Sequence, residues 1–273
     1  MPAKIAMLER TPVARLIRDF GTFIWLQALS SIFGISVFLI LAFTRQVAIP
    51  GVPRYDLILL LCVAVQWLMV RSGLETKDEL KVVSLFHLIG LGLEIYKVHH
   101  GSWTYPEAGY LKIAGVPLYS GFMYAAVASY ITQAWRRFDL SMRPLPPGWL
   151  ALGLAGSIYL NFFTHHYLPD IRWPLMLAVL AIYTRTRCTF TVQGTRYWLP
   201  LSLAFLLIGL FIWVAENIAT FLGAWQYPQQ RATWSMVHES KITSWFLLVI
   251  ISYIVVAWLK DIKAVKLAIS KSE

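Results

Sequence analysis

The sequence predicts an all-α integral membrane protein with eight transmembrane helices, arranged as two parallel four-helix repeats with both termini in the cytoplasm. The composition, the apolar segments and the distribution of basic residues support this fold class. Of the 273 residues, 58% are hydrophobic and only 14% are charged, whereas soluble domains carry about 25% charged residues. A chain this apolar has too little polar surface for a soluble coat, so its side chains are expected to face lipid.

Eight apolar segments predict the spans, each of which needs about 20 residues to cross a bilayer. They cover residues 23–44, 55–70, 82–98, 118–135, 149–164, 172–184, 198–222 and 242–259. The fifth and sixth are the weakest, because the sixth has only a short apolar stretch before Arg185 and Arg187. Whether both of them cross fully stays open.

Residues 1–22 precede the first span and predict an interfacial helix on the inner leaflet. Apolar residues recur there at helical spacing with basic residues opposite them, namely Val13, Leu16, Ile17 and Phe20 against Arg15 and Arg18. A basic tail without regular structure is the alternative. The first apolar run lacks a small-residue cleavage site, so it is interpreted as a retained helix instead of a signal peptide.

The basic residues predict the orientation of the spans. One side holds 17 of the 24 Lys and Arg residues, and the other side holds 7, which include Lys97 and Arg172 at the outer ends of their spans. Cytoplasmic loops carry this excess in membrane proteins, which places both termini on the cytoplasmic side of the plasma (inner) membrane. The net charge of +10 is thereby explained without nucleic acid, and no basic-aromatic motif supports such a partner.

An internal repeat divides the chain. The pattern E-x6-G-x-W-x-Y-P begins at Glu94 and again at Glu216, an offset of 122 residues, and residues 129–135 match residues 252–258 at an offset of 123. Two matches that occur in the same order and at nearly the same offset indicate a duplicated unit whose copies have the same orientation. We therefore predict one membrane domain, 1–273, with repeat halves at 1–140 and 145–262.

Glu94 and Glu216 form the sharpest candidate site. Each lies within one to two turns of the outer end of its span. Each is followed by the Gly-x-Trp-x-Tyr-Pro stretch, here called the exit motif, at 101–106 and 223–228. Ionisable groups inside a membrane are costly and usually face a cavity. Two carboxylates held close together in a low dielectric suit acid/base chemistry or cation binding. The alternative is structural, with each Glu bonding backbone or a Lys at its helix end.

Histidines gather at the same outer level. Asn161 and His165 share a helix face, and with His166 and the two Glu they complete the predicted catalytic set. The histidines would serve as proton shuttles or as ligands of a divalent metal: His99, His100, His165, His166 and His238. Their spacing matches no specific zinc motif, and a polar interfacial belt is the alternative.

Aromatic and polar residues at this level are predicted to line a pocket for an apolar, unsaturated ligand. They are Trp103, Tyr105, Trp225, Tyr227, His87, Asn217 and Lys241. The interfacial aromatic belt of membrane proteins is the alternative for the aromatic residues. A packed core residue is the alternative for His87, which lies mid-helix two turns before Glu94.

Several stretches carry a family resemblance, among them GLEIYKVHHGSWTYPE, YLNFFTHHYLPDIRW and WVAENIATFLGAWQYP. In these the chain resembles the bacterial multi-pass membrane proteins grouped as domain of unknown function 817, which implies no established activity. The Glu, the Gly-x-Trp-x-Tyr exit and Gly-Val-Pro at 115–117 look more loosely like membrane-embedded carotenoid cyclases and hydratases. That resemblance implies a long polyene ligand and acidic groups near the membrane surface. Leu118 and Tyr119 stand where those proteins have a doubled acidic motif.

Three classes of function remain from the sequence. The first is a membrane-embedded enzyme that acts on a lipid or isoprenoid in the outer half of the bilayer. The second is an ion-coupled transporter, and the third is a non-catalytic structural or sensory protein. No motif for ATP hydrolysis, dinucleotide binding or serine hydrolysis is present. Membrane lipids or an isoprenoid are the expected partners, and the oligomeric state is left open.

Overall fold

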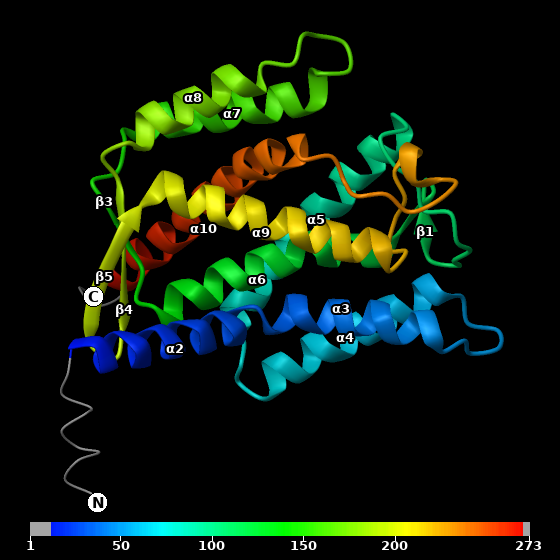
Figure 1. Cartoon of the computed structure of the whole chain (residues 1–273), viewed down its shortest axis with the longest axis horizontal. Helices are drawn as coiled ribbons and strands as arrows, with labels where there is room; N and C mark the ends of the chain where they lie inside the picture. The colour runs from blue at the N-terminus through cyan, green and yellow to red at the C-terminus, as the bar shows by residue number, and fades with distance from the viewer. Residues whose placement is uncertain (1–11, 270–273) are drawn as a thin grey trace, which may run out of the picture.

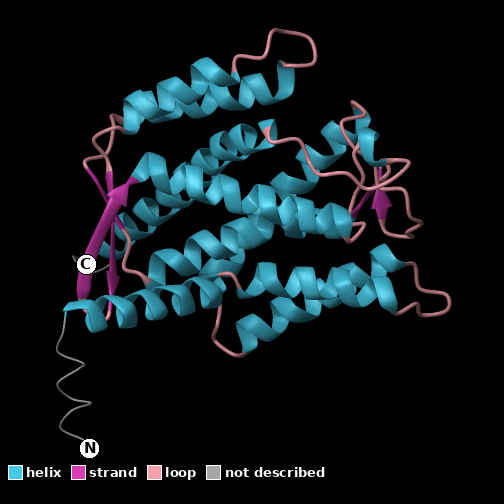
Figure 2. Cartoon of the chain, in the orientation of Figure 1, coloured by secondary structure: helices cyan, strands magenta, loops and turns pink. Residues whose placement is uncertain are grey.

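The protein is mostly helical, and its helices run lengthwise between two ends that carry the strands (Figure 1). The structure is a computed structural model that describes residues 12–269, with side chains for residues 12–257. A three-stranded sheet lies at one end, here called the sheet end, and a two-stranded hairpin lies at the other, the hairpin end (Figure 2). Helices α7 and α8 form an outer layer on one side of the bundle, and α2, α3 and α4 form the opposite side (Figure 1).

Seven of the eight predicted apolar segments each fall mainly on one helix, and the first, 23–44, is divided between α2 and α3. The α-helices are α2 Pro12–Ser30, α3 Ile32–Gln46, α4 Arg54–Arg71, α5 Lys77–His99, α6 Gly121–Arg137, α7 Gly148–Thr164, α8 Arg172–Tyr183, α9 Leu201–Phe221 and α10 Ser240–Ile269. Two short 3-10 helices are η1 Leu118–Ser120 and η2 Pro228–Gln230. The strands are β1 Lys112–Ile113, β2 Val116–Pro117, β3 Ser141–Arg143, β4 Arg187–Val192 and β5 Thr195–Pro200.

Fewer than eight of these helices are long and apolar enough to cross a membrane on their own. Among the described residues, α5, α9 and residues 240–257 of α10 meet this requirement, and the bent pair α2–α3 is a fourth candidate if it counts as one span. Helices α7 and α8 are apolar but shorter. With 12 residues, α8 is about 18 Å long, well short of a hydrocarbon core of about 30 Å.

The start of the first span differs from the prediction. Helix α2 runs through the expected boundary at residue 22, and the chain instead bends by 62° between α2 and α3. Ser30 Oγ donates to Leu26 O at 2.8 Å, and such bonds to the carbonyl four residues back bend helices. Leu16 and Ile17 are 60% and 67% exposed, as expected for an interfacial helix. Residues 1–11 of the predicted helix lie outside the described residues.

The sheet corrects the all-α prediction. Strands β3, β4 and β5 pair antiparallel in that order, with Thr189 opposite both Ser141 and Trp198. Gln193 and Gly194 join β4 to β5 with positive φ angles of 47° and 78°, the backbone of a two-residue hairpin turn that favours glycine. Cys188 is buried in β4.

The core separates into two main clusters of buried apolar residues. One consists of residues from α3 to α6, together with the loop that follows α9. The other joins α7 and α8 to α9 and α10. Glycines bring the helices close: a Cβ on Gly121 of α6 would lie 2.5 Å from His87 O of α5, and one on Gly209 of α9 would lie 2.9 Å from Phe246 N of α10.

Glu75 lies buried between α4 and α5, with 1% of its surface exposed. Ser129 Oγ donates to its Oε1 at 2.7 Å, and Gln66 Nε2 donates to its Oε2. Burial raises the pKa of the Glu75 carboxyl above its ordinary value, and the bonds from Ser129 and Gln66 offset part of that rise. The folded protein therefore holds this proton more tightly than the unfolded chain does.

We expect Glu75→Gln to make the stability of the protein less dependent on pH. A raised carboxyl pKa gives stability that is complete below the unfolded pKa, about 4.3, and is lost as the pH rises toward the folded value. The wild type should therefore lose about 1 kcal/mol or more relative to Glu75→Gln between pH 4 and pH 8, because one pKa unit corresponds to about 1.4 kcal/mol. Thermal unfolding in detergent at several pH values measures this. Parallel curves for the two proteins contradict it, and exposed Glu239→Gln is the control.

Candidate functional site

Glu94 of α5 is held by neutral donors at the hairpin end. It is 3% exposed. Its Oε2 accepts from Trp103 Nε1 at 2.6 Å and from Tyr105 OH at 2.7 Å, and its Oε1 accepts from Tyr124 OH at 2.9 Å. Trp103 and Tyr105 belong to the exit loop after α5, and Tyr124 belongs to the first turn of α6. The exit motif thus folds back over the carboxylate that precedes it.

Glu216 of α9 has a matching environment. It is also 3% exposed. Tyr227 OH of the second exit loop donates to its Oε1, and Trp245 Nε1 near the start of α10 donates to its Oε2 at 2.8 Å. In both copies, an aromatic residue eleven positions after the Glu and one from the next helix supply the donors. Both oxygens of each carboxyl are therefore occupied by uncharged partners.

The two exit loops end their helices in the same way and pair with each other. Gly101 and Gly223 follow α5 and α9 with positive φ angles of 68° and 75°, which suits a helix terminus that closes on glycine. Thr104 N donates to Gln226 O at 2.9 Å, and Gln226 N donates to Thr104 O at 2.9 Å. This antiparallel bridge joins equivalent residues of the two motifs, and the exit loops hold both carboxylates in the same region.

A half-enclosed cavity of about 920 Å³ opens beside the carboxylates. Glu94 and Glu216 line one part of it, and apolar side chains line most of the rest, as far as Phe23 of α2 and Phe190 of β4. Pockets for small molecules usually measure about 300–1,000 Å³ and combine an apolar wall with few polar groups. The size and lining of this cavity match a large apolar ligand with a small polar part.

Four of the seven residues predicted to contact a ligand line this cavity, namely Trp103, Trp225, Tyr227 and Lys241. Tyr105 lies behind the wall and bonds Glu94. His87 packs against Phe122 with ring centroids 4.5 Å apart. Asn217 bonds Trp213 O and Val237 N. These three residues support the site or the core without lining the cavity.

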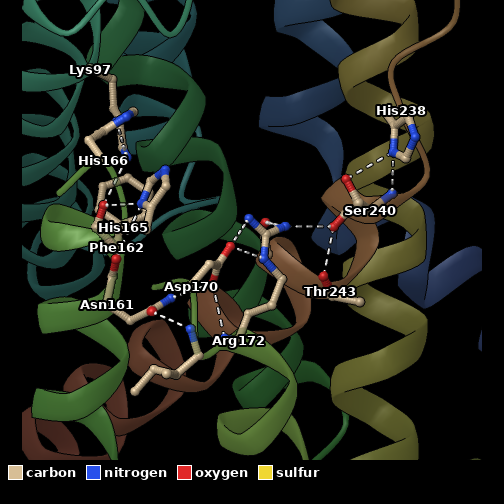
Figure 3. A network of polar contacts seen from close by, with 12 residues as sticks. Lys97, Asn161, Phe162, His165, His166, Asp170, Arg172, His238, Ser240 and Thr243 are labelled. Carbon is tan, nitrogen blue, oxygen red and sulfur yellow. Dashed lines mark hydrogen bonds and ion pairs between the residues drawn. The ribbon is translucent and has the colours of Figure 1, made fainter. Parts of the chain in front are cut away.

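The predicted residues of the α7–α8 loop form a polar network (Figure 3). Asn161 Nδ2 donates to Asp170 Oδ1 at 3.0 Å, and Arg172 pairs with Asp170 Oδ2 at 2.5 Å. Burial raises the pKa of the Asp170 carboxyl, but the hydrogen bonds from Arg172 and Asn161 outweigh it and bring the pKa down to about 2. Asn161, His165 and Arg172 line the cavity, so this network forms part of its wall.

His99, His100, His165 and His166 lie close together, with neighbouring ring centroids 4.1–5.4 Å apart. His238 lies apart from them and bonds Ser240 (Figure 3). His100 uses both ring nitrogens, on Tyr96 O and Tyr167 OH, and Lys97 Nζ lies 3.4 Å from His166 Nε2. Within residues 12–257, no three His, Cys, Asp or Glu side chains converge as metal ligands. The donors in this part of the chain therefore do not fit a divalent metal.

Lys97 and Arg172 also line the cavity, although the sequence interpretation used them only as topology charges. Lys97 is 2% exposed and lies one turn after Glu94 on the same helix. An ionisable residue within a predicted span is a functional candidate by itself, and this signal could have identified Lys97. Tyr124 and Trp245 carried no such signal, because their contacts to the carboxylates depend on how α6 and α10 pack.

The fold and the site together define a mostly helical protein with apolar helices long enough to cross a membrane and a large cavity bordered by buried carboxylates. Residues 19–253 match the family described as "Protein of unknown function (DUF817)", and the chain belongs to this family. It is 57% identical over 249 residues to "Uncharacterized protein YoaT" of Bacillus subtilis (strain 168). The aligned region covers 91% of this chain and 94% of that protein. A solved structure of a cross-linked MvINS trimer aligns with 66% of this chain and 92% of its own, at 13% identity and a TM-score of 0.45.

Proposed function

We propose that this protein is a membrane-embedded enzyme that binds a lipid or isoprenoid in its central cavity and acts on it with Glu94 and Glu216. The observation that carries the proposal is the cavity of about 920 Å³, whose wall is mostly apolar and which both carboxylates border. A ligand that fits this wall is itself mostly apolar, and such molecules are most abundant in the membrane.

The proposed topology places all eight apolar segments in the membrane as two parallel halves with both termini in the cytoplasm. The charge distribution supports the orientation. The matching environments of Glu94 and Glu216 and the pairing of Thr104 with Gln226 support the duplication. Helix α8 is too short to cross alone, so in this topology α7 and α8 enter beside the longer helices and the polar α7–α8 loop meets the outer surface.

The carboxylates suit proton exchange with a bound ligand. Each borders the cavity, and each is surrounded by hydroxyl and indole donors instead of a bonded cation. Tyr124 and Tyr227 can both accept and donate a hydrogen bond, so their contacts accommodate either protonation state of the carboxyl. The carboxyls lie at the hairpin end of the cavity and not at its middle, which fits a reaction near the membrane surface better than a carrier with a central binding site.

A substitution that fills the cavity should abolish ligand binding. Ala204 of α9 lines the cavity, and Ala204→Trp places an indole in the space that the ligand would occupy. Protein purified in detergent is extracted, and its bound lipids are identified by mass spectrometry. We expect the wild type and Ala181→Trp, an exposed position on α8, to retain the same lipid and Ala204→Trp to lose it. Equal retention by all three proteins contradicts binding in this cavity.

The catalytic part of the proposal is tested in cells. Glu94→Gln and Glu216→Gln preserve the shape of each side chain and remove its acid group. We expect either variant, at normal expression, to change the lipid or isoprenoid profile as much as deletion of the gene does. If deletion changes the profile and both variants restore it fully, the carboxylates have no chemical role.

A further inference from the structure

Lys97 and Lys241 both border the cavity close to the carboxylates, yet neither is ion-paired. Among the described residues, no carboxylate oxygen lies within 4.0 Å of either ammonium. Buried or half-buried lysines are normally paired, because removing a charge from water is costly. The two lysines are therefore the unusual feature of this wall.

The groups that touch these lysines are a carbonyl, aromatic rings and, for Lys97, the imidazole of His166, whose Nε2 lies 3.4 Å from Lys97 Nζ. Lys97 Nζ donates to Phe162 O at 2.8 Å and lies 4.0 Å from the centre of the Phe162 ring. Lys241 Nζ lies 4.8 Å from the centre of the Tyr227 ring and 5.4 Å from that of Trp103. Such contacts hold an ammonium in place and leave N–H donors for a further partner.

The neighbouring acids are already engaged. Glu94 and Glu216 accept from Trp and Tyr donors on both oxygens, and Asp170 is taken by Arg172 and Asn161 (Figure 3). Arg172 borders the same cavity and uses its other nitrogen on Ser244 Oγ at 3.2 Å. Three cations thus border one cavity, and within the described chain only Arg172 has a bonded carboxylate.

We propose that the cavity binds a single-chain anionic lipid, with its carboxylate or phosphate head between Lys97 and Lys241 and its hydrocarbon chain along the apolar wall. This rests on the proposed function, since it names the class of lipid bound at the same site. Charge-assisted hydrogen bonds to the two ammonium groups supply the missing partners. The head then lies beside Glu94 and Glu216, where the proposed proton exchange takes place.

The test compares two probes with the same chain and different heads. Dibrominated stearic acid and dibrominated stearyl alcohol quench tryptophan fluorescence on binding, and Trp103, Trp225 and Trp245 border the cavity. At pH 8 we expect the full-length protein in detergent to bind the acid about tenfold more tightly than the alcohol, or better. Lys97→Gln with Lys241→Gln should remove this preference and keep the affinity for the alcohol within about twofold.

Lys81→Gln is the matched control. Lys81 lies on the same helix, and its side chain is 79% exposed in a surface pair with Asp78, so the preference for the acid should be unchanged. If the wild type binds the acid and the alcohol with equal affinity, the proposal of an anionic head is wrong, whereas the proposal of a lipid-binding cavity still holds. Absence of binding by both probes overturns the proposed function itself. Displacement of the acid by equimolar inorganic phosphate overturns a lipid as the source of the anion.

Discussion

Glu94→Ala should prevent the protein from accumulating in a folded state. The substitution leaves the Trp103 indole and the Tyr105 and Tyr124 hydroxyls without their common acceptor. A buried donor without a partner costs about 1–3 kcal/mol, so three together cost several kcal/mol. Proteins are stable by only about 5–15 kcal/mol, and this loss consumes a large part of that margin. Size-exclusion chromatography and thermal unfolding in detergent measure the effect.

Glu94→Gln separates the structural role of this residue from its chemistry. An amide oxygen in place of Oε2 still accepts from Trp103 and Tyr105, and the amide nitrogen can donate to Tyr124 OH. We expect the Gln variant to fold with a loss of about 1 kcal/mol or less. Exposed Glu239→Ala is the control for loss of a carboxylate. Normal folding of Glu94→Ala would show that these three bonds do not support the bundle.

Gly209→Ala should destabilise the protein although alanine is the better helix former. The new Cβ would lie 2.9 Å from Phe246 N and 3.1 Å from Phe246 Cα, and backbone atoms cannot move aside as a side chain can. Helices α9 and α10 must then separate, and overpacking of this kind typically costs about 1–3 kcal/mol. A lower melting temperature, measured in detergent, is the expected result.

Gly156→Ala is the matched control, because a Cβ at this position of α7 meets nothing within 4 Å. It should raise stability by up to about 1 kcal/mol, the usual gain from replacing glycine with alanine in a helix. The two substitutions are chemically identical and are expected to change stability in opposite directions. A shift of the same sign in both variants would mean that helix propensity and not the α9–α10 contact decides the outcome.

The helices could be predicted from the sequence because their cause is local. An apolar run as long as 242–259 favours a helix over a strand, because strands are rarely longer than about ten residues. The sheet was missed for a related reason. Thr189, Thr191 and Val192 favour a strand, and Gln193-Gly194 favours the turn. Arg187 and Arg196 lie in the same stretch between two predicted spans, where they count as charges of a cytoplasmic loop.

The candidate site was predictable in part. The repeated motif E-x6-G-x-W-x-Y-P identified Glu94 and Glu216 because it is visible in the spacing along the chain. The cavity was not predictable in the same way, since its wall comes from helices distant in the sequence, such as α2 and α10. Lys97 was assigned to topology because a count of charges by side does not distinguish a buried ammonium from an exposed one.

The bridge between Thr104 and Gln226 has a consequence for how a ligand enters. Its two hydrogen bonds join main-chain atoms. They therefore do not depend on the identity of the side chains, which differ between the two positions. The two bonds tie the loops that follow α5 and α9 to each other at the hairpin end. For the proposed lipid ligand, we therefore expect the passage from the bilayer into the cavity to open between other elements than these two loops.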